Sequence, residues 1–257
     1  MRSFAHILTG LFRPGKALER AGDAVKWRWI PLALILIGSV LFKTAVSTPM
    51  KIEAQSAEAE AMIQEQIESM PEADQRQYEK DMAAAEANGE FTQDQALDTA
   101  MQVTSIADIV FGALGALVAI LYTATFFFVA AKTWANPVKF TAMLTIAALS
   151  LLPNAIRNVI QGISMASTGV WLRYSGLGAL VAPSDPAQAP GAAYAVLSQI
   201  DSFVIWGLLI LAGALLSKTI GIDKKRAFPA MLVFIVVTGL LKAVPVIVSS
   251  LLAGAVM

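Results

Sequence analysis

Cysteine is absent from the 257 residues of the chain, and histidine occurs once, as His6. Without cysteine the protein cannot form disulfides, use thiol chemistry or bind a metal through thiolates. A single histidine near the N-terminus excludes a histidine-based triad or zinc site inside a membrane-embedded core. The sequence also has no glycine-rich phosphate loop ending in Lys-Ser or Lys-Thr. We therefore predict a protein that is not an enzyme, with no catalytic residue, no cofactor and no metal site.

Charge is also scarce, because charged residues make up 15% of the chain and hydrophobic residues 56%. Soluble domains contain about 25% charged residues, so this chain has too few to cover a water-facing globule. A helix needs about 20 apolar residues to cross a bilayer core about 30 Å thick. The sequence predicts an all-α integral membrane protein with five transmembrane helices, near residues 29–46, 106–131, 140–160, 200–217 and 227–251.

The few charges are unevenly distributed and predict an orientation. Segment 1–28 and the links after the second and fourth apolar stretches are basic, whereas segment 47–105 has thirteen acids against three bases. Lys and Arg accumulate in cytoplasmic loops. Five spans place every basic segment on one side, so we expect a cytoplasmic N-terminus, an extracytoplasmic acidic insertion and an extracytoplasmic C-terminus.

The N-terminal segment 1–28 is predicted to be amphipathic. Apolar residues such as Ile7, Leu8 and Leu11 recur at helical spacing within residues 2–13. Such a helix lies on the cytoplasmic leaflet or forms a lid over the ends of the spans, and the two interpretations are compatible. A signal peptide over residues 30–42 is disfavoured by the 28-residue lead-in and by Lys43.

The acidic insertion, 47–105, is predicted to be helical. Pro49 suits the first position of a helix, Ser69 and Glu72 have capping-box spacing, and Asn88 marks a stop. A further helix is expected to run without interruption from Gln93 into the second span. The outer loop 161–199 is rich in small residues and proline, with a short helix expected at 175–181.

Charged residues within or beside the apolar stretches form the candidate site. They fall in the outer half of the bilayer and are Lys43, Asp108, Arg157, Asp201 and Lys242. Intramembrane charges are costly and suggest function, so a polar chamber for an anionic headgroup or a solute is one hypothesis. The other hypothesis is a set of interfacial ion pairs and snorkelling lysines that tie helix ends together. Asn154, Arg157 and Gln161 share one face of the third span, which interhelical hydrogen bonding explains.

Three motifs, in this order and spacing, resemble the Yip family (Ypt/Rab-interacting proteins), bacterial branch. They are Pro14-Gly15-Lys16-Ala17-Leu18 with Trp27 and Pro31, the run Asp201-Ser202-Phe203-Val204-Ile205-Trp206-Gly207, and Lys225-Arg226-Ala227. The family-like positions are Pro14, Ala17, Trp27, Asp201, Phe203, Trp206, Arg226 and Ala227. The resemblance implies a five-helix protein of the bacterial inner membrane, with no enzymatic activity or cofactor. Eukaryotic members bind small GTPases and act in vesicle traffic, and some bacterial members are thought to accompany ABC-type exporters.

From these features we expect a scaffold or accessory subunit of a membrane transport or export assembly. Its expected partners are the lipid bilayer and a membrane protein, such as an ABC exporter, or a second copy of the chain. Two alternatives stay open: a carrier or channel subunit for a small solute or lipid that uses the charged cluster, and a membrane-shaping protein that uses residues 2–13. Basic residues cluster too briefly for nucleic-acid binding.

Overall fold

The computed structural model describes residues 11–14, 28–88, 93–134, 138–174, 176–183, 191–198 and 200–255. Across these ranges every regular element is a helix and none is a strand, as predicted for an all-α protein. Three of the described helices are long and apolar enough to cross a membrane: α3 (Trp29–Ser69), α5 (Gln93–Trp134) and α6 (Phe140–Thr168). The apolar helix α8 (Ser202–Leu215) is shorter, and α9 (Lys224–Ala255) ends the chain. The number of five spans stays a prediction.

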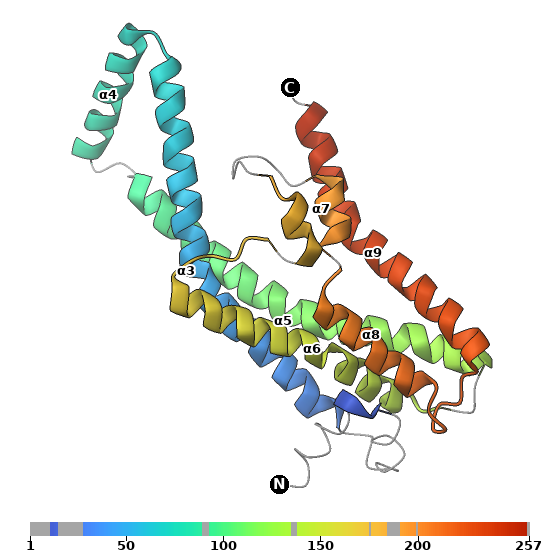
Figure 1. Cartoon of the computed structure of the whole chain (residues 1–257). Helices are drawn as coiled ribbons and strands as arrows, with labels where there is room; N and C mark the ends of the chain where they lie inside the picture. Colours follow the sequence, from blue (N-terminus) through green and yellow to red (C-terminus); the bar gives the residue numbers. More distant parts are fainter. Residues whose placement is uncertain are drawn as a thin grey trace.

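Helix α6 lies at the centre of the bundle. It packs against α3, α5 and α8, while α9 contacts α5 and α8 only near its beginning and then diverges from them (Figure 1). Most of the buried residues shared by these helices are small or aliphatic, including Ala147 and Ala148 of α6 and Ala214 and Leu215 of α8. Small side chains let two helix backbones approach closely, which is how helices associate within a bilayer.

Helix α8 approaches the central helix closely at Gly207. A methyl group placed on this glycine would collide with the backbone carbonyl oxygen of Ser150 on α6. A residue without a side chain is therefore required here, and this contact fixes α8 against the central helix.

Aromatic rings join α9 to α5. Phe234 of α9 lies with its ring centroid 5.5 Å from Tyr122, 5.3 Å from Phe126 and 5.0 Å from Phe127. Ring pairs at these separations contribute beyond the area they bury. This aromatic cluster anchors the first half of α9 to the bundle.

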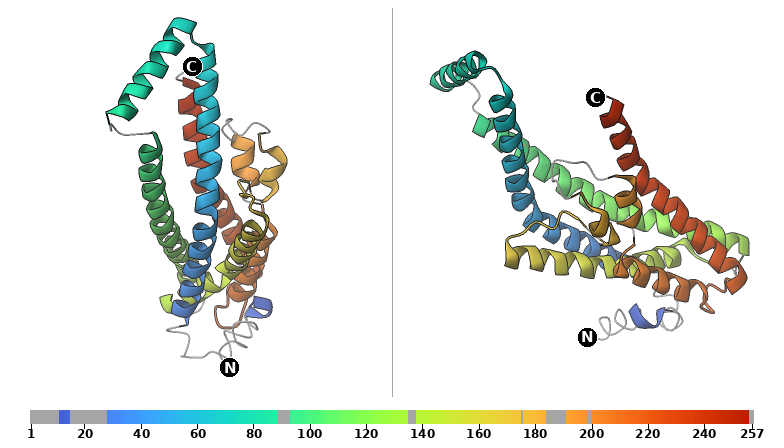
Figure 2. Two further views of the ribbon diagram at one scale, coloured as in Figure 1. Left: turned by 90° about the vertical axis from the view of Figure 1, so that its left-hand side faces the viewer. Right: turned by 45° about the horizontal axis from the view of Figure 1, so that its top comes forward.

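Helices α3 and α4 (Glu72–Ala87) form a hairpin that projects from the bundle (Figures 1 and 2). The prediction of a helix beginning at Pro49 is wrong, because α3 continues through this proline without a break. Proline removes one backbone donor, but the hydroxyl of Thr48 donates to the carbonyl of Thr44 (2.8 Å), so local hydrogen bonding continues through this turn.

The turn between α3 and α4 differs from the predicted capping box. The hydroxyl of Ser69 donates back to the carbonyl of Gln66 within α3. Gln75 closes the turn instead, because its amide nitrogen donates to the carbonyls of Ile67 and Met70, both at 2.9 Å. The predicted stop is confirmed, since α4 ends at Ala87.

Helix α5 confirms the prediction of one uninterrupted helix from Gln93 into the second span. The region after α6 contains the 3₁₀ helix η2 (Gly176–Val181), where a short helix was expected, and α7 (Ala192–Leu197). Gly176 has a φ of 60°, and its neighbour Leu177 donates a backbone hydrogen bond to the carbonyl of Ile200. This pairing holds the loop beside the beginning of α8.

Part of the N-terminal segment packs on α8. Leu11 is buried in the core, and its carbonyl accepts a hydrogen bond from the indole of Trp206. Phe12 lies with its ring centroid 5.9 Å from that of Trp206, and Pro14 approaches Gly213. Residues 11–14 therefore cover part of α8, in agreement with the interpretation of the segment as a lid. The remainder of the predicted amphipathic helix lies outside the described residues.

Candidate functional site

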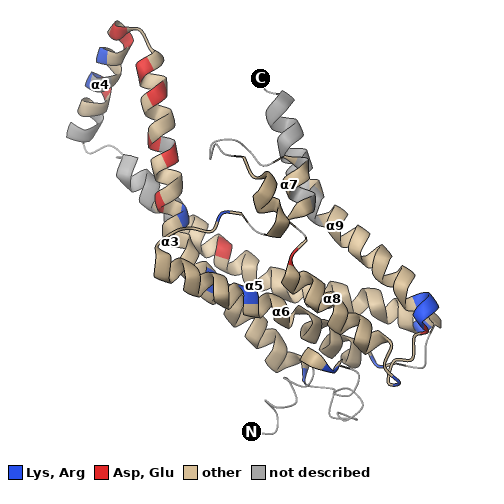
Figure 3. Cartoon of the chain, viewed as in Figure 1, with Lys and Arg blue, Asp and Glu red and all other residues tan. Residues whose placement is uncertain are grey.

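Charges separate along the molecule (Figure 3). Acidic residues predominate on the projecting α3–α4 hairpin, which also carries Arg76 and Lys80, and basic residues gather toward the opposite end, around the beginnings of α3 and α9. A few charged residues of both signs lie between these regions, within the apolar bundle. They include the residues predicted from the sequence to form a cluster.

Arg157 of α6 and Asp201 form an ion pair between the central helix and α8. An oxygen of Asp201 accepts from the guanidinium of Arg157 at 3.3 Å, and the two side chains are 23% and 10% exposed. The other carboxylate oxygen accepts the backbone N–H of Phe203 at 2.7 Å. Asp201 thus caps the N-terminus of α8, where a negative charge is favoured, and holds Arg157 in the same contact.

Lys43 lies on α3 where that helix meets α6, one turn after Ser39, which accepts a hydrogen bond from Asn158, and directly after Phe42. Its side chain is half-buried, and no hydrogen-bond acceptor for it occurs in the described part of the chain. The neighbouring contact shows how close the helices are here, because the ring of Phe42 packs directly over Gly162 of α6. Lys43 and Arg157 together exceed the single negative charge of Asp201.

The polar face predicted on α6 extends from this ion pair. Asn154 Oδ1, Arg157 Nε and Gln161 Oε1 are all buried without a hydrogen-bond partner in the described structure. Asn158, which the sequence analysis did not single out, donates to the hydroxyl of Ser39 on α3 at 3.4 Å. Because Asn158 follows Arg157 by one residue, its side chain contacts α3, whereas that of Arg157 contacts the beginning of α8.

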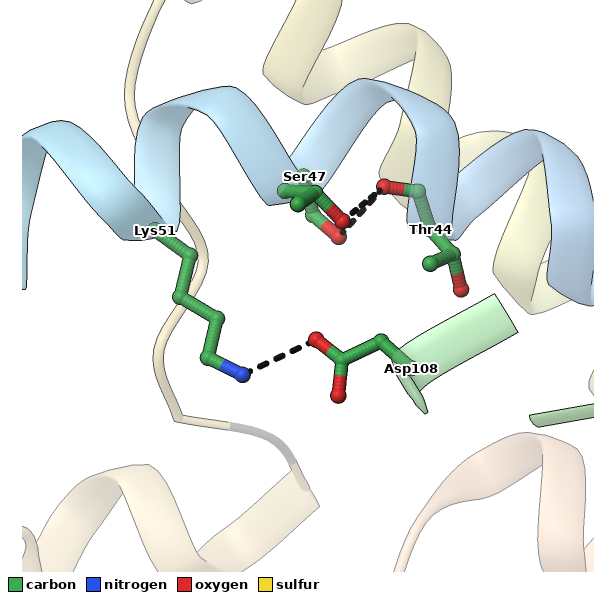
Figure 4. A network of polar contacts seen from close by, with 5 residues as sticks. Thr44, Ser47, Lys51 and Asp108 are labelled. Atoms are coloured by element: carbon green, nitrogen blue, oxygen red, sulfur yellow. Dashed lines mark hydrogen bonds and ion pairs between the residues drawn. The ribbon is translucent and has the colours of Figure 1, made fainter. Parts of the chain in front are cut away.

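Asp108 forms a separate pair with Lys51 (Figure 4). The lysine Nζ lies 2.9 Å from the carboxylate, and both side chains are partly exposed. Lys51 follows Pro49 on α3, one turn beyond the hydroxyl contacts of Ser47 and Thr48 with the carbonyl of Thr44. The sequence analysis missed Lys51 because nothing in the sequence pairs residues 57 positions apart.

The structure therefore brings together three of the five predicted residues, Lys43, Arg157 and Asp201, whereas Asp108 is paired elsewhere. The side chain of Lys242 lies outside the described residues, although its backbone belongs to α9. We use the name α3–α6–α8 polar cluster for Lys43, Asn154, Arg157, Gln161 and Asp201.

A further ion pair joins the outer loop to α3. The guanidinium of Arg173 lies 2.7 Å from the carboxylate of Glu58, and its cationic centre lies 5.8 Å from the ring of Trp171 and 5.6 Å from that of Tyr174. Sequence reasoning missed both charged partners, because the two residues lie 115 positions apart in the chain. This contact fixes the base of the projecting hairpin to the loop.

The family-like motif positions lie around α8. Asp201 caps the helix, Trp206 binds the backbone of Leu11, and Pro14 packs near Gly213. The backbone N–H groups of Arg226 and Ala227 donate to the carbonyl of Asp223 and begin α9. Phe203 provides the amide that Asp201 caps, whereas Ala17 and Trp27 lie outside the described residues.

The chemistry available to these residues is charge pairing and hydrogen bonding. The described residues contain no group of three or more His, Asp or Glu side chains placed to hold a metal ion. The sequence matches the model of the Yip1 domain family over residues 9–244. No curated protein and no solved structure is significantly similar to the chain.

Proposed function

Because the chain belongs to the Yip1 domain family, whose members are generally membrane proteins, we propose that it is a non-enzymatic scaffold or accessory subunit of a membrane transport or export assembly. The proposal includes five spans in a bacterial inner membrane, with the N-terminus in the cytoplasm and the C-terminus outside. Three long apolar helices and the separation of charge along the molecule support this arrangement.

The observation that carries the proposal is the isolation of α4. Most of its described side chains are exposed, and in both views of Figure 2 it stands away from the bundle. Helices in proteins gain most of their stability from packing one face against neighbouring elements rather than from intrinsic propensity. Helix α4 has 16 residues, and the described residues give it no packed neighbour apart from its turn with α3. A partner surface would supply the missing contacts.

The charge of the hairpin defines the chemistry of that partner. Helix α4 carries Glu72, Asp74 and Asp81 among its exposed acids, and the upper part of α3 adds Glu60, Glu65 and Glu68. Complementary charge guides association and selects partners more than it adds affinity. The expected partner is a membrane protein with a basic surface on the side of the hairpin.

Site-specific photo-crosslinking in native membranes tests this proposal. Crosslinkers at Gln66 and Gln77, both exposed on the hairpin, are expected to capture a stoichiometric transporter subunit. A crosslinker at Val118, on the exposed apolar face of α5, is the matched control and is expected to capture lipid. The triple variant E72Q/D74N/D81N removes charge without removing helix, and it is expected to lose the captured partner.

Two outcomes contradict the scaffold function. One is capture of nothing but a second copy of the chain from the hairpin positions. The other is capture of the transporter subunit that the triple variant leaves undiminished, because the acidic surface would then have no part in the contact.

A carrier or channel subunit is the second candidate function. The α3–α6–α8 polar cluster favours it, because charged and amide groups lie together within the apolar bundle. Substrate uptake that is abolished by R157Q, with the hairpin crosslinks unchanged, would distinguish a carrier from a scaffold.

A further inference from the structure

The α3–α6–α8 polar cluster has an excess of positive charge. Lys43 lies where α3 contacts α6 and Arg157 lies on the facing helix, while Asp201 is the single acid of the cluster and pairs with Arg157. Opposite charges attract far more strongly in a region of low dielectric than in water, and an uncompensated charge there is correspondingly costly. The cluster therefore calls for one more negative charge than the described residues supply.

The cluster also has buried hydrogen-bonding groups that lack a partner in the described structure. Arg157 uses one nitrogen of its guanidinium for Asp201, while its Nε is buried without an acceptor. The side-chain amides of Asn154 and Gln161 flank it, and each has a buried oxygen without a partner in the described structure. Rotating either amide group by 180° exchanges this oxygen for the NH₂ group, which is a hydrogen-bond donor. Buried polar groups in folded proteins are paired with protein, water or a ligand, so these groups leave room for a partner that the described residues do not supply.

The depth of the cluster identifies a class of anion. Lys43 lies about 21 Å along α3 from Trp29, and Arg157 lies about 26 Å along α6 from Phe140, at about 1.5 Å per residue. Both are therefore in the last third of an apolar layer about 30 Å thick, on the side of the hairpin. A lysine or arginine at this depth reaches the headgroup level by extending its apolar stem. The abundant anion at that level is the phosphate of a lipid.

We propose that Lys43 and Arg157, flanked by Asn154 and Gln161, form an oxyanion site at the junction of α3, α6 and α8 that holds the phosphate of a lipid headgroup. Arg157 offers a planar set of donors suited to phosphate, and Lys43 adds a point charge from the opposite helix. Asp201 holds Arg157 in place and leaves the cluster with one net positive charge. The bound lipid would act as a structural ligand between the central helix and its two neighbours.

This inference depends on membrane insertion and not on an export partner. Crosslinking from Gln66 and Gln77 tests the partner, whereas lipid retention tests the cluster. Failure of either experiment therefore leaves the other interpretable.

Native mass spectrometry of the full-length protein in lipid nanodiscs tests the site. The wild type is expected to retain phosphatidylglycerol and phosphatidylcholine after release from the nanodisc, and to lose diacylglycerol, which has the same tails without phosphate. K43Q is the informative variant, because Lys43 has no hydrogen-bond partner among the described residues to lose. It is expected to weaken phospholipid binding about tenfold, in line with loss of one charged hydrogen bond, whereas K43R retains binding.

K51Q is the matched control, since Lys51 is a lysine of the same helix that already has a carboxylate partner. It is expected to retain phospholipid as the wild type does. R157K tests geometry, because it keeps the charge but removes the planar donors, and circular dichroism verifies that each variant is folded.

Three results would overturn the assignment. Diacylglycerol retained as tightly as phosphatidylglycerol would show that the tails alone bind. Equal retention by the wild type and K43Q would exclude Lys43 from the site. A thermal shift caused by inorganic phosphate, without any retained phospholipid, would mean that the site binds free anions and not a lipid.

Discussion

In a soluble helical bundle, the more hydrophobic helices are the more buried ones. The order is reversed here when the central helix α6 is compared with the outer helices α3 and α5. The most apolar window of α6 has a mean hydropathy of 1.4, against 2.0 for α3 and 2.1 for α5. Yet 67% of the residues in that window of α6 are buried, against 22% for each of the other two. The least hydrophobic of the three long helices is therefore the most buried.

This inversion follows from the solvent. In water, apolar surface is driven inside, whereas lipid tails are as apolar as a leucine side chain and give no such drive. Lipid tails offer no hydrogen-bond partner to polar groups such as Asn158 and Arg157, so the helix that carries them is enclosed. Helix α5 exposes large apolar side chains, among them Phe111, Leu114 and Val118, which lipid covers at no cost.

The largest effect is expected where α8 meets the central helix. G207L places a branched side chain against the carbonyl of Ser150, and overpacking of this kind costs about 1–3 kcal/mol or more. We expect a loss of folded protein, measured as a lower midpoint of thermal unfolding in detergent. G115L on α5 is the control, because no atom lies within 4 Å of a methyl group built at Gly115. Equal destabilisation by both variants would remove the distinction between the central and outer helices.

An intermediate effect is expected at Asp201, which both caps α8 and neutralises Arg157. D201N keeps a capping side chain but leaves the arginine charge unpaired, whereas D201A loses both. We expect D201A to be destabilised relative to D201N by about 1 kcal/mol, the usual contribution of a cap. Chemical denaturation of the two variants measures the difference. Identical midpoints would show that the cap contributes nothing to this helix.

The smallest effect is expected at the Lys51–Asp108 pair, which lies between α3 and α5. Both side chains are partly exposed, and exposed ion pairs contribute about 0–1 kcal/mol. K51Q and D108N, alone and combined, form a double-mutant cycle, and the expected coupling energy is below about 1 kcal/mol. A coupling larger than that of the corresponding R157Q and D201N cycle would reverse the ranking of central and peripheral contacts.

Local sequence patterns predicted much of the helical architecture. Helix α5 is uninterrupted because no proline or glycine interrupts residues 93–111, and α4 ends where Asn88 predicts. The shared face of Asn154, Arg157 and Gln161 follows from helical spacing alone, since residues three, four and seven apart lie on one side of a helix. Membership of the Yip1 domain family was also predicted correctly, from motifs whose order was more informative than any one of them.

The wrong predictions share one cause. Pro49 and Ser69 were interpreted by local preference, as a helix start and a cap, but α3 continues through Pro49 and the hydroxyl of Ser69 donates to a backbone carbonyl of its own helix. Propensity is a weak guide wherever such partners exist. The contact between Glu58 and Arg173 was invisible in the same way, because the two residues are 115 positions apart.

The sequence by itself determined that this is an apolar, helical chain with an acidic segment and basic links, because composition and period depend only on the order of residues. Only the tertiary structure decided which charges meet. It paired Arg157 with Asp201, placed Lys43 beside them without a partner, and gave Asp108 to Lys51. The physical reason is that ion pairing depends on separations of a few ångströms between helices, which are set by close contacts such as Gly207 on Ser150 and Phe42 on Gly162.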